Sequence, residues 1–280
     1  MSKDLIPVLR LLFWNVGRLP RAEMVAALCA EHDVGVLVLA EWDESPDAIT
    51  SELAKVSINL AWTSDEQSRL HRFHLPELEL QTISSDVSRK LVLSEFRWNQ
   101  TRFLLGAVHL LSPLRTDLAD RDAEAVNISA SIRQQELERK HSRTIVIGDL
   151  NLNPFDRGVA QATGFHAVMS KRQMTERQRT VQGREYPYFY NPMWGHLGDR
   201  TPGPPGTFYY RNSAHLSYDW NTFDQVLLRP EVLDLVDEEV AILDHCGDLS
   251  LLNAAGRPDN TVGSDHLPLL VTLRWKGGMH

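Results

Sequence analysis

The sequence predicts a β-rich protein of the α/β or α+β class, because buried strand patterns alternate with helical ones. The near-continuous apolar run at 34–41 (VGVLVLAE) is typical of a strand covered on both faces of its sheet. Two further strand patterns, 89–98 and 101–110, are joined by WNQT at 98–101, which predicts a hairpin turn. Helical patterns between the strands favour a mixed class over an all-β one.

The expected elements follow in chain order. Strands are expected at 8–14, 34–41, 89–98, 101–110, 143–151, 222–228 and 267–275. Helices are expected at 21–31, 45–56 and 116–140. The last helix should bury a seam through Val126, Ala130 and Leu137. Residues 157–219 mix glycine, proline and aromatic residues and give no regular pattern.

The composition is that of a globular protein, with 42% hydrophobic and 24% charged residues in 280. A chain of this length can bury a sizeable core. Because no linker-like segment divides it, we expect one catalytic domain over residues 1–280. The net charge of −8 argues against an indiscriminate binder of long nucleic acid, although a local basic groove is compatible with it.

The cysteines and the apolar segments bear on the compartment. Cys29 and Cys246 are too few for a disulfide framework or a cysteine-rich zinc site, and Cys29 is expected to be buried. The apolar run at 5–16 is interrupted by Arg10 and lacks a cleavage pattern, which is not typical of a signal peptide. No segment has the roughly 20 apolar residues of a membrane helix. We therefore expect a cytoplasmic protein that does not contact a membrane.

Polar side chains stand where the apolar strand patterns end. They are Asn15, Glu41, His109, Asp149, Asn151, Asp265 and His266. A further carboxylate, Asp224, lies inside a strand pattern and requires a donor or cationic partner if it is buried. Each has an ordinary reading, as an exposed strand end, a core histidine or a turn residue. Together they favour a ligand site at one rim of a sheet.

Five short motifs carry a resemblance to a known family. In chain order they are FWN (13–15), AE (40–41), GDLN (148–151), FDQVLL (223–228) and GSDH (263–266). In type and order they resemble the endonuclease–exonuclease–phosphatase superfamily, which includes deoxyribonuclease I, exonuclease III and the inositol polyphosphate 5-phosphatases. The resemblance implies a four-layer αββα sandwich, with two packed mixed β-sheets flanked by helices.

The resemblance also implies a site. Glu41 would be the principal ligand of Mg²⁺, supported by Asn15 and Asp265, and Mn²⁺ could replace Mg²⁺. Mg²⁺ prefers such hard oxygen ligands. The catalytic groups implied are Asp149 and Asn151 near water and phosphate, His109 on a phosphate oxygen, and His266 paired with Asp224.

Two segments depart from the family pattern. The first motif continues as WNVGRLP (14–20), where DNA-repair members more commonly have Asn-x-Asn-Gly. The second reads AEWDES (40–45), where many members have Gln before the Glu. Both departures weigh against the DNA-repair subgroup.

A basic and aromatic stretch predicts substrate contacts. Residues 171–184 hold five Lys or Arg and one Glu, and aromatic residues follow up to Trp194. This pairing suits single-stranded nucleic acid, with a solvated loop held by packed aromatics as the alternative. The contacts predicted here and in the second aromatic group (208–210), which could also be β-core, are Arg172, Arg179, Tyr188 and Arg211.

Three functions remain open from the sequence. The first is a metal-dependent phosphoesterase acting as a Mg²⁺-dependent nuclease on DNA or RNA. The second is a phosphatase for a small-molecule or lipid head-group phosphate, which the acidic net charge favours slightly. The third is an inactive binding module on the same fold. The sequence leaves the oligomeric state open.

Overall fold

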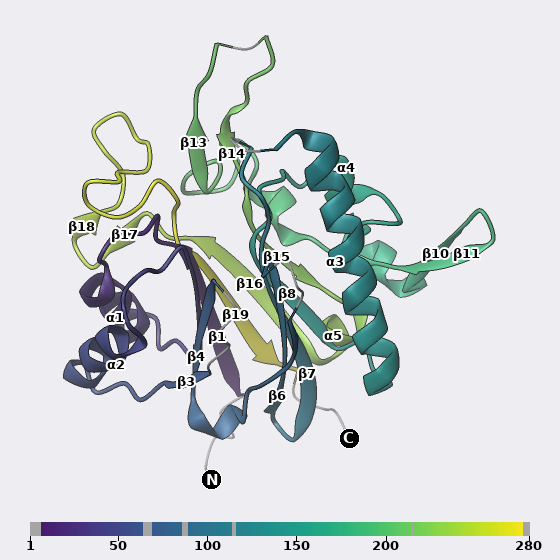
Figure 1. Ribbon diagram of the computed structural model, residues 1–280, viewed down its shortest axis with the longest axis horizontal. Coiled ribbons are helices and arrows are strands. Elements are labelled where there is room, and N and C mark those ends of the chain that lie inside the picture. Colours follow the sequence, from purple (N-terminus) through teal and green to yellow (C-terminus); the bar gives the residue numbers. More distant parts are fainter. Residues whose placement is uncertain (1–6, 64–68, 86–88, 114–115, 214, 277–280) are drawn as a thin grey trace.

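Two large β-sheets pack face to face in the computed structural model, which describes residues 7–63, 69–85, 89–113, 116–213 and 215–276 (Figure 1). One sheet consists, in spatial order, of β16 (Val236–Ile242), β19 (Leu269–Trp275), β1 (Val8–Asn15), β2 (Val36–Ala40), β4 (Leu70–His74) and β3 (Ala61–Thr63). The other consists of β5 (Gln81–Ser85), β6 (Leu91–Trp98), β7 (Thr101–His109), β8 (Thr144–Asp149), β15 (Asp224–Leu228), β12 (Phe189–Tyr190) and β9 (Ala167–Val168).

Helices cover the outer faces of both sheets. The six-stranded sheet carries α1 (Ala22–Glu31) and α2 (Pro46–Lys55), and the seven-stranded sheet carries α3 (Leu118–Arg139) and α4 (Arg157–Ala160) (Figure 1). A short helix, α5 (Pro230–Leu235), leads into β16. Three-residue to six-residue 3₁₀ turns are η1 (Pro76–Leu78), η2 (Lys171–Glu176) and η3 (Pro192–His196). Within the described residues no helix has the length and apolarity that crossing a bilayer requires.

Three hairpins stand apart from the large sheets. They are β10 (Gln178–Val181) with β11 (Arg184–Pro187), β13 (Phe208–Tyr210) with β14 (Asp219–Asn221), and β17 (His245–Cys246) with β18 (Leu249–Ser250). The β10–β11 and β13–β14 hairpins extend from different sides of the molecule (Figure 1). The sequence pattern predicted neither of these two hairpins.

Alternating side chains divide the apolar residues into layers. In β1, Leu11 and Phe13 face the core between the sheets, whereas Leu12 and Trp14 face the helices outside. A third apolar cluster fills the space between the seven-stranded sheet and α3. Because successive residues of a strand point to opposite faces, one strand contributes to two interfaces. Three apolar interfaces separate four layers, so the expected αββα arrangement is confirmed.

Other expectations can be compared with the elements. The hairpin between β6 and β7 is confirmed, with φ of +47° at Asn99 and +60° at Gln100, as a two-residue turn requires. Cys29 is buried, and burial raises the pKa of its thiol to about 12.

The seam expected in α3 is wrong. The helix buries Ala125, Ile128 and Ile132, whereas Leu137 is 74% exposed. The buried face also holds two acidic residues: Asp122 accepts a hydrogen bond from the Gly158 amide, and Glu136 pairs with the buried Arg229. Because these buried acidic residues have partners, the hydrophobicity pattern alone predicted the wrong buried face for α3.

Strand register brings the polar residues to one end of the sandwich. The parallel pair β7–β8 sets His109 opposite Asp149, and the antiparallel pair β8–β15 sets Asp149 opposite Asp224. In the other sheet, the parallel pair β1–β2 sets Asn15 opposite Ala40, directly before Glu41. These strands therefore end on the same side of the molecule.

Gly148 is the backbone position on which this register depends. Its φ is +155°, and a Cβ there would lie 1.9 Å from the Val108 carbonyl oxygen. We predict that Gly148→Ala lowers the free energy of unfolding by at least about 2 kcal/mol, because the clash is with backbone. Denaturant unfolding measures it. The control is Gly183→Ala, with φ +77° and open space around it, where a cost of about 1 kcal/mol is expected. Equal costs at the two positions would contradict the register argument.

Candidate active site

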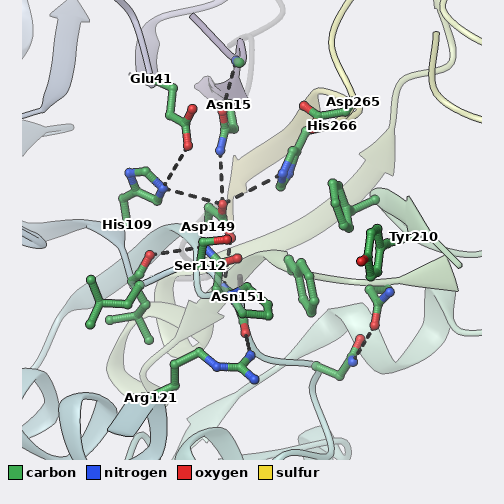
Figure 2. Close-up of a pocket in the computed structure, with 18 of the residues that line it drawn as sticks. Asn15, Glu41, His109, Ser112, Arg121, Asp149, Asn151, Tyr210, Asp265 and His266 are labelled. Carbon is green, nitrogen blue, oxygen red and sulfur yellow. Dashed lines mark hydrogen bonds and ion pairs between the residues drawn. The ribbon is translucent and has the colours of Figure 1, made fainter. Parts of the chain in front are cut away.

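A pocket of about 1600 Å³ opens at the end of the sandwich where the polar strand ends meet (Figure 2). The first sheet contributes Asn15 and, directly after β2, Glu41. The second contributes His109 and Asp149, and the loop before β19 contributes His266. Asn151 and Asp265 also line it, and Asp224 lies behind His266. The eight catalytic and metal residues expected from the sequence are therefore brought together.

Asp149 is at the centre of this group and is 1% exposed. Its Oδ2 accepts a hydrogen bond of 3.0 Å from Asn15 Nδ2, and its Oδ1 accepts one of 2.8 Å from the Asn151 amide. The Nε2 atoms of His109 and His266 lie 3.7 Å and 4.0 Å from the same Oδ2 (Figure 2). Asp149 thus links both sheets and both histidines.

Glu41 lines the pocket from the six-stranded sheet, directly after β2. Its φ of +50° is uncommon for a residue with a side chain and is held by the sheet on either side. One carboxylate oxygen lies 3.5 Å from His109 Nε2 and the other 3.7 Å from Arg18 Nε. A strained backbone that aims a carboxylate into a pocket is a common feature of functional sites.

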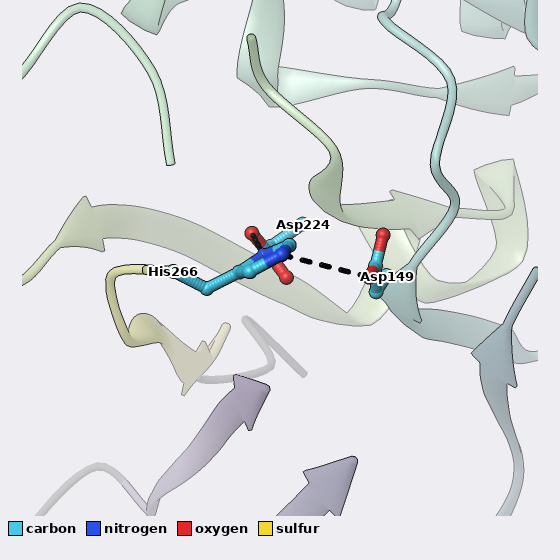
Figure 3. Close-up of side chains that lie close together, drawn as sticks. All are labelled: Asp149, Asp224 and His266. Carbon is cyan, nitrogen blue, oxygen red and sulfur yellow. Dashed lines mark hydrogen bonds and ion pairs between the residues drawn. The ribbon is translucent and has the colours of Figure 1, made fainter. Parts of the chain in front are cut away.

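His266 and Asp224 form a buried pair (Figure 3). His266 Nδ1 donates to Asp224 Oδ2 at 2.8 Å, and Asp224 is fully buried. Burial alone would lower the pKa of His266, but the carboxylates of Asp224, Asp149 and Asp265 outweigh it and raise the pKa to about 10. Burial raises the pKa of Asp224, against the pull of the imidazolium. The pair holds Nε2 of a charged imidazole toward Asp149.

The loop that carries His266 is fixed by three contacts. Trp14 Nε1 donates to the His266 carbonyl at 2.9 Å, and Ser264 Oγ donates to the Asn15 carbonyl at 2.8 Å. Arg21 Nε donates to the Gly263 carbonyl at 2.7 Å. The imidazole is therefore positioned by the first strand and the first helix as well as by its own loop.

Sequence reasoning missed the arginines that line the pocket, two of which, Arg121 and Arg18, contact expected site residues. Arg121, in the first turn of α3, donates to the Asn151 carbonyl and lines the pocket. Asn151 has φ +47°, and its side-chain amide donates to the Leu110 carbonyl at 3.1 Å. Arg18 contacts Glu41, as described above. The available signal was their position shortly after His109 and Asn15, at strand ends already singled out.

The donor set fits a hard divalent cation. Glu41 and Asp265 present accessible carboxylates, and Asn15 and Asp149 add oxygens close by. Among the described residues, Asp149, Asp224 and His266 form an acidic cluster with ligand atoms within 4.8 Å of one another. Asp224 is fully buried and already bonded to His266 Nδ1, so Asp149 is the carboxylate of this cluster that lines the pocket.

The four residues expected to bind substrate do not line the pocket. The Tyr188 ring is 3% exposed and packs on His166 in the core, so the expectation of a stacking surface there is wrong. Arg172 lies in η2 and Arg179 in β10, outside the pocket lining. Arg211 instead pairs with Asp219 across the β13–β14 hairpin at 2.7 Å. Part of the basic stretch forms the β10–β11 hairpin, which is mostly exposed and does not line the pocket.

Solved structures share this architecture. The chain superimposes with a TM-score of 0.58 and 11% identity on an endonuclease/exonuclease/phosphatase family protein from Bacteroides thetaiotaomicron, covering 97% of this chain and 99% of that one. The chain has the endonuclease/exonuclease/phosphatase fold. The human Nocturnin catalytic domain with bound sulfate shows the same fold (TM-score 0.57, 15% identity, 98% and 96% covered). So does D. rerio TDP2 complexed with a single-strand DNA product (TM-score 0.57, 17% identity, 95% and 99% covered).

Sequence comparisons give a different result. Neither a family model nor a curated protein matches the chain. The endonuclease/exonuclease/phosphatase fold is therefore recognised by comparing backbones.

We predict that Asp224→Asn lowers the pKa of His266. The wild-type pKa is raised to about 10, and the substitution removes the largest of the charges that raise it, so burial, which lowers it, is opposed only by Asp149 and Asp265. Because the folded-state pKa exceeds the ordinary 6.5, the pair stabilises the fold fully below pH 6.5 and loses this contribution as the pH rises through about 10. NMR titration of the imidazole measures the shift. The exposed His245–Asp244 pair is the internal control, and an unchanged His266 pKa in Asp224→Asn would contradict the assignment.

Proposed function

We propose that this protein is a metal-dependent phosphoesterase, and more narrowly a Mg²⁺-dependent nuclease that hydrolyses phosphodiester bonds. The observation that carries the proposal is the arrangement around Asp149. The buried Asp149 carboxylate has the Nε2 atoms of His109 and His266 at 3.7 Å and 4.0 Å. The accessible carboxylates of Glu41 and Asp265 line the same pocket. The imidazoles can contact the oxygens of a phosphate ester, and the carboxylates can hold a divalent ion beside it.

Glu41 would be the principal metal ligand, with Asn15 and Asp265 in support. When bound, Mg²⁺ or Mn²⁺ neutralises charge on the phosphoryl oxygens. The Arg18 guanidinium near Glu41 has a side chain 54% exposed, so its ion pair is weak enough for the carboxylate to serve a second partner.

The protein's own residues would position water and phosphate. His266 is protonated near neutral pH, so it donates to a phosphate oxygen and stabilises developing charge. Asp149, held by Asn15 and the Asn151 amide, would accept the proton of the attacking water. His109, between Glu41 and Asp149, would contact another phosphate oxygen. Asp224 accepts a hydrogen bond from Nδ1 of His266 and so fixes the orientation of the ring.

Nucleic acid is the substrate class we favour. The structurally similar D. rerio TDP2 was solved with a single-strand DNA product. The pocket of this chain is rimmed by Arg18, Arg69 and Arg89, which suit a run of phosphates despite the net charge of −8. We further propose that residues 1–280 form one catalytic domain, because one apolar cluster is shared by both sheets. A cytoplasmic location agrees with the two free cysteines.

We predict that His266→Ala reduces nuclease activity by about a hundredfold to ten-thousandfold, because an acid–base group is lost. Purified protein is incubated with Mg²⁺ and single-stranded DNA, duplex DNA, RNA or a panel of phosphomonoesters, with EDTA as a second control. His245→Ala is the matched variant, because that histidine also pairs with an aspartate at 2.8 Å but lies outside the pocket. Phosphate release from monoesters alone would replace the nuclease by a phosphatase.

We predict that Glu41→Gln weakens the binding of Mn²⁺ by at least about tenfold, since a charged oxygen ligand becomes neutral. Electron paramagnetic resonance of free Mn²⁺ measures the affinity without substrate. Glu44→Gln, a nearby carboxylate outside the pocket lining, is the control. Equal affinities of wild type and Glu41→Gln would remove Glu41 from the metal site.

A further inference from the structure

The β13–β14 hairpin carries aromatic side chains that its own packing does not require. Its register pairs Phe208 with Asn221 and Tyr210 with Asp219, and it belongs to neither large sheet. Strand alternation turns Phe208 and Tyr210 toward the pocket, whereas Tyr209 turns away to contact Trp220. The hairpin projects from the end of the sandwich at which the pocket opens (Figures 1 and 2).

Three rings form a graded series beside the catalytic histidine. Phe223 and Phe208 stack with centroids 5.4 Å apart and planes at 24°, and Phe208 and Tyr210 follow at 6.4 Å and 19°. The Phe208 ring also lies 4.6 Å from the His266 imidazole. Exposure rises along the series from 7% at Phe223 to 45% at Tyr210. The series thus begins in the core and ends on a ring accessible in the pocket.

Polar contacts hold the two strands of the hairpin together, and a bridge to His266 fixes its position. Arg211 donates to Asp219 Oδ2 through Nε at 2.9 Å and through a terminal nitrogen at 2.7 Å. Ser217 Oγ donates to the other oxygen of Asp219 at 3.0 Å. Phe208 forms a bridge with His266 itself. Aromatic rings that stay exposed to water on a fixed hairpin do not stabilise the core. Such exposed apolar groups are typical of a binding surface.

The side of the pocket at β4 and β6 has different chemistry. Arg69 and Arg89 line the pocket directly before these two strands, which lie beyond β2 and β7 in the strand order and away from β15, and Arg18 pairs with Glu41. Aromatic rings on one side of the pocket and guanidinium groups on another match a chain that alternates flat bases with phosphates. A base in a duplex has its faces covered by its neighbours, so only an unpaired base can stack on a protein ring.

We propose that Tyr210, backed by Phe208, is the stacking platform for an unpaired nucleobase next to the scissile phosphate, while Arg69 and Arg89 hold phosphates farther along the strand. This rests on the proposed nuclease function and narrows its substrate to nucleic acid with an unpaired base at the cleavage position. A small phosphate ester without a ring would contact only the groups around Asp149 and would contact neither the aromatic rings nor the arginines.

The test compares two single-stranded oligonucleotides. In each, one linkage is an ordinary phosphodiester and the others are uncharged methylphosphonates, so the position of cleavage is defined. One substrate has bases beside that linkage, and the other has abasic tetrahydrofuran units there. The ratio of kcat/KM for the two substrates measures recognition of the base. We expect Tyr210→Ala to lower this ratio by about tenfold to a hundredfold, the usual loss for one stacked base.

Two variants control for indirect effects. Tyr210→Phe keeps the ring and should keep the ratio. Trp62→Ala removes an aromatic residue that is 44% exposed on β3, outside the pocket lining, and should change neither substrate. An equal loss on both substrates in Tyr210→Ala, or no loss, would overturn the platform.

A binding measurement separates this proposal from the proposed function. An oligonucleotide with 2-aminopurine as its unpaired base is added to wild-type protein in EDTA, which prevents metal-dependent cleavage, and quenching of its fluorescence by a stacked ring is followed. If wild type with Mg²⁺ cleaves no oligonucleotide but quenching is present and is lost in Tyr210→Ala, the platform stands and the nuclease assignment fails. If quenching is absent, the platform fails whatever the activity.

Discussion

The hydrogen bond from Asn15 to Asp149 is the contact on which the site depends. It joins the end of β1 in one sheet to the end of β8 in the other, through a carboxylate that is 1% exposed. Two packed sheets could slide relative to each other by small distances with little loss of apolar contact, because dispersion and burial have no direction. A charge-assisted hydrogen bond has a preferred length and angle, and so it fixes the relative position of the two strand ends.

Charge imposes a second constraint at the same place. Four carboxylates, from Glu41, Asp149, Asp224 and Asp265, meet at one end of the molecule. Like charges at short range are costly where water is scarce, and the raised pKa of His266 is one response to them. The carboxylates of Glu41 and Asp265 remain as negative charges that repel the others. A divalent cation would relieve this repulsion, so metal affinity and the stability of this end of the fold are coupled.

The sequence was most informative where a residue's role is set locally. Apolar runs identified β2 and β8, the turn at Asn99 and Gln100 was correct, and strand ends marked the polar residues that meet in the pocket. The face of α3 was misjudged, because buried Asp122 and Glu136 have partners that a hydrophobicity pattern cannot detect. Tyr188 was misjudged for a related reason: basic neighbours in the sequence suggested a surface, whereas register places its ring in the core. Arg18 and Arg121 follow strand ends in the sequence, but their contacts with Glu41 and Asn151 depend on the tertiary fold and were not predicted.

The position of β1 in its sheet has a consequence for synthesis. Its two neighbours are β2, which follows soon after, and β19, whose residues pair with it from more than two hundred positions away. Pairing over such separations is slow and must await the later segment. While a ribosome is still producing the middle of the chain, β1 would have one open edge and His266 would not yet exist. The candidate site would therefore be completed only late in translation, and an incomplete nascent polypeptide would lack it.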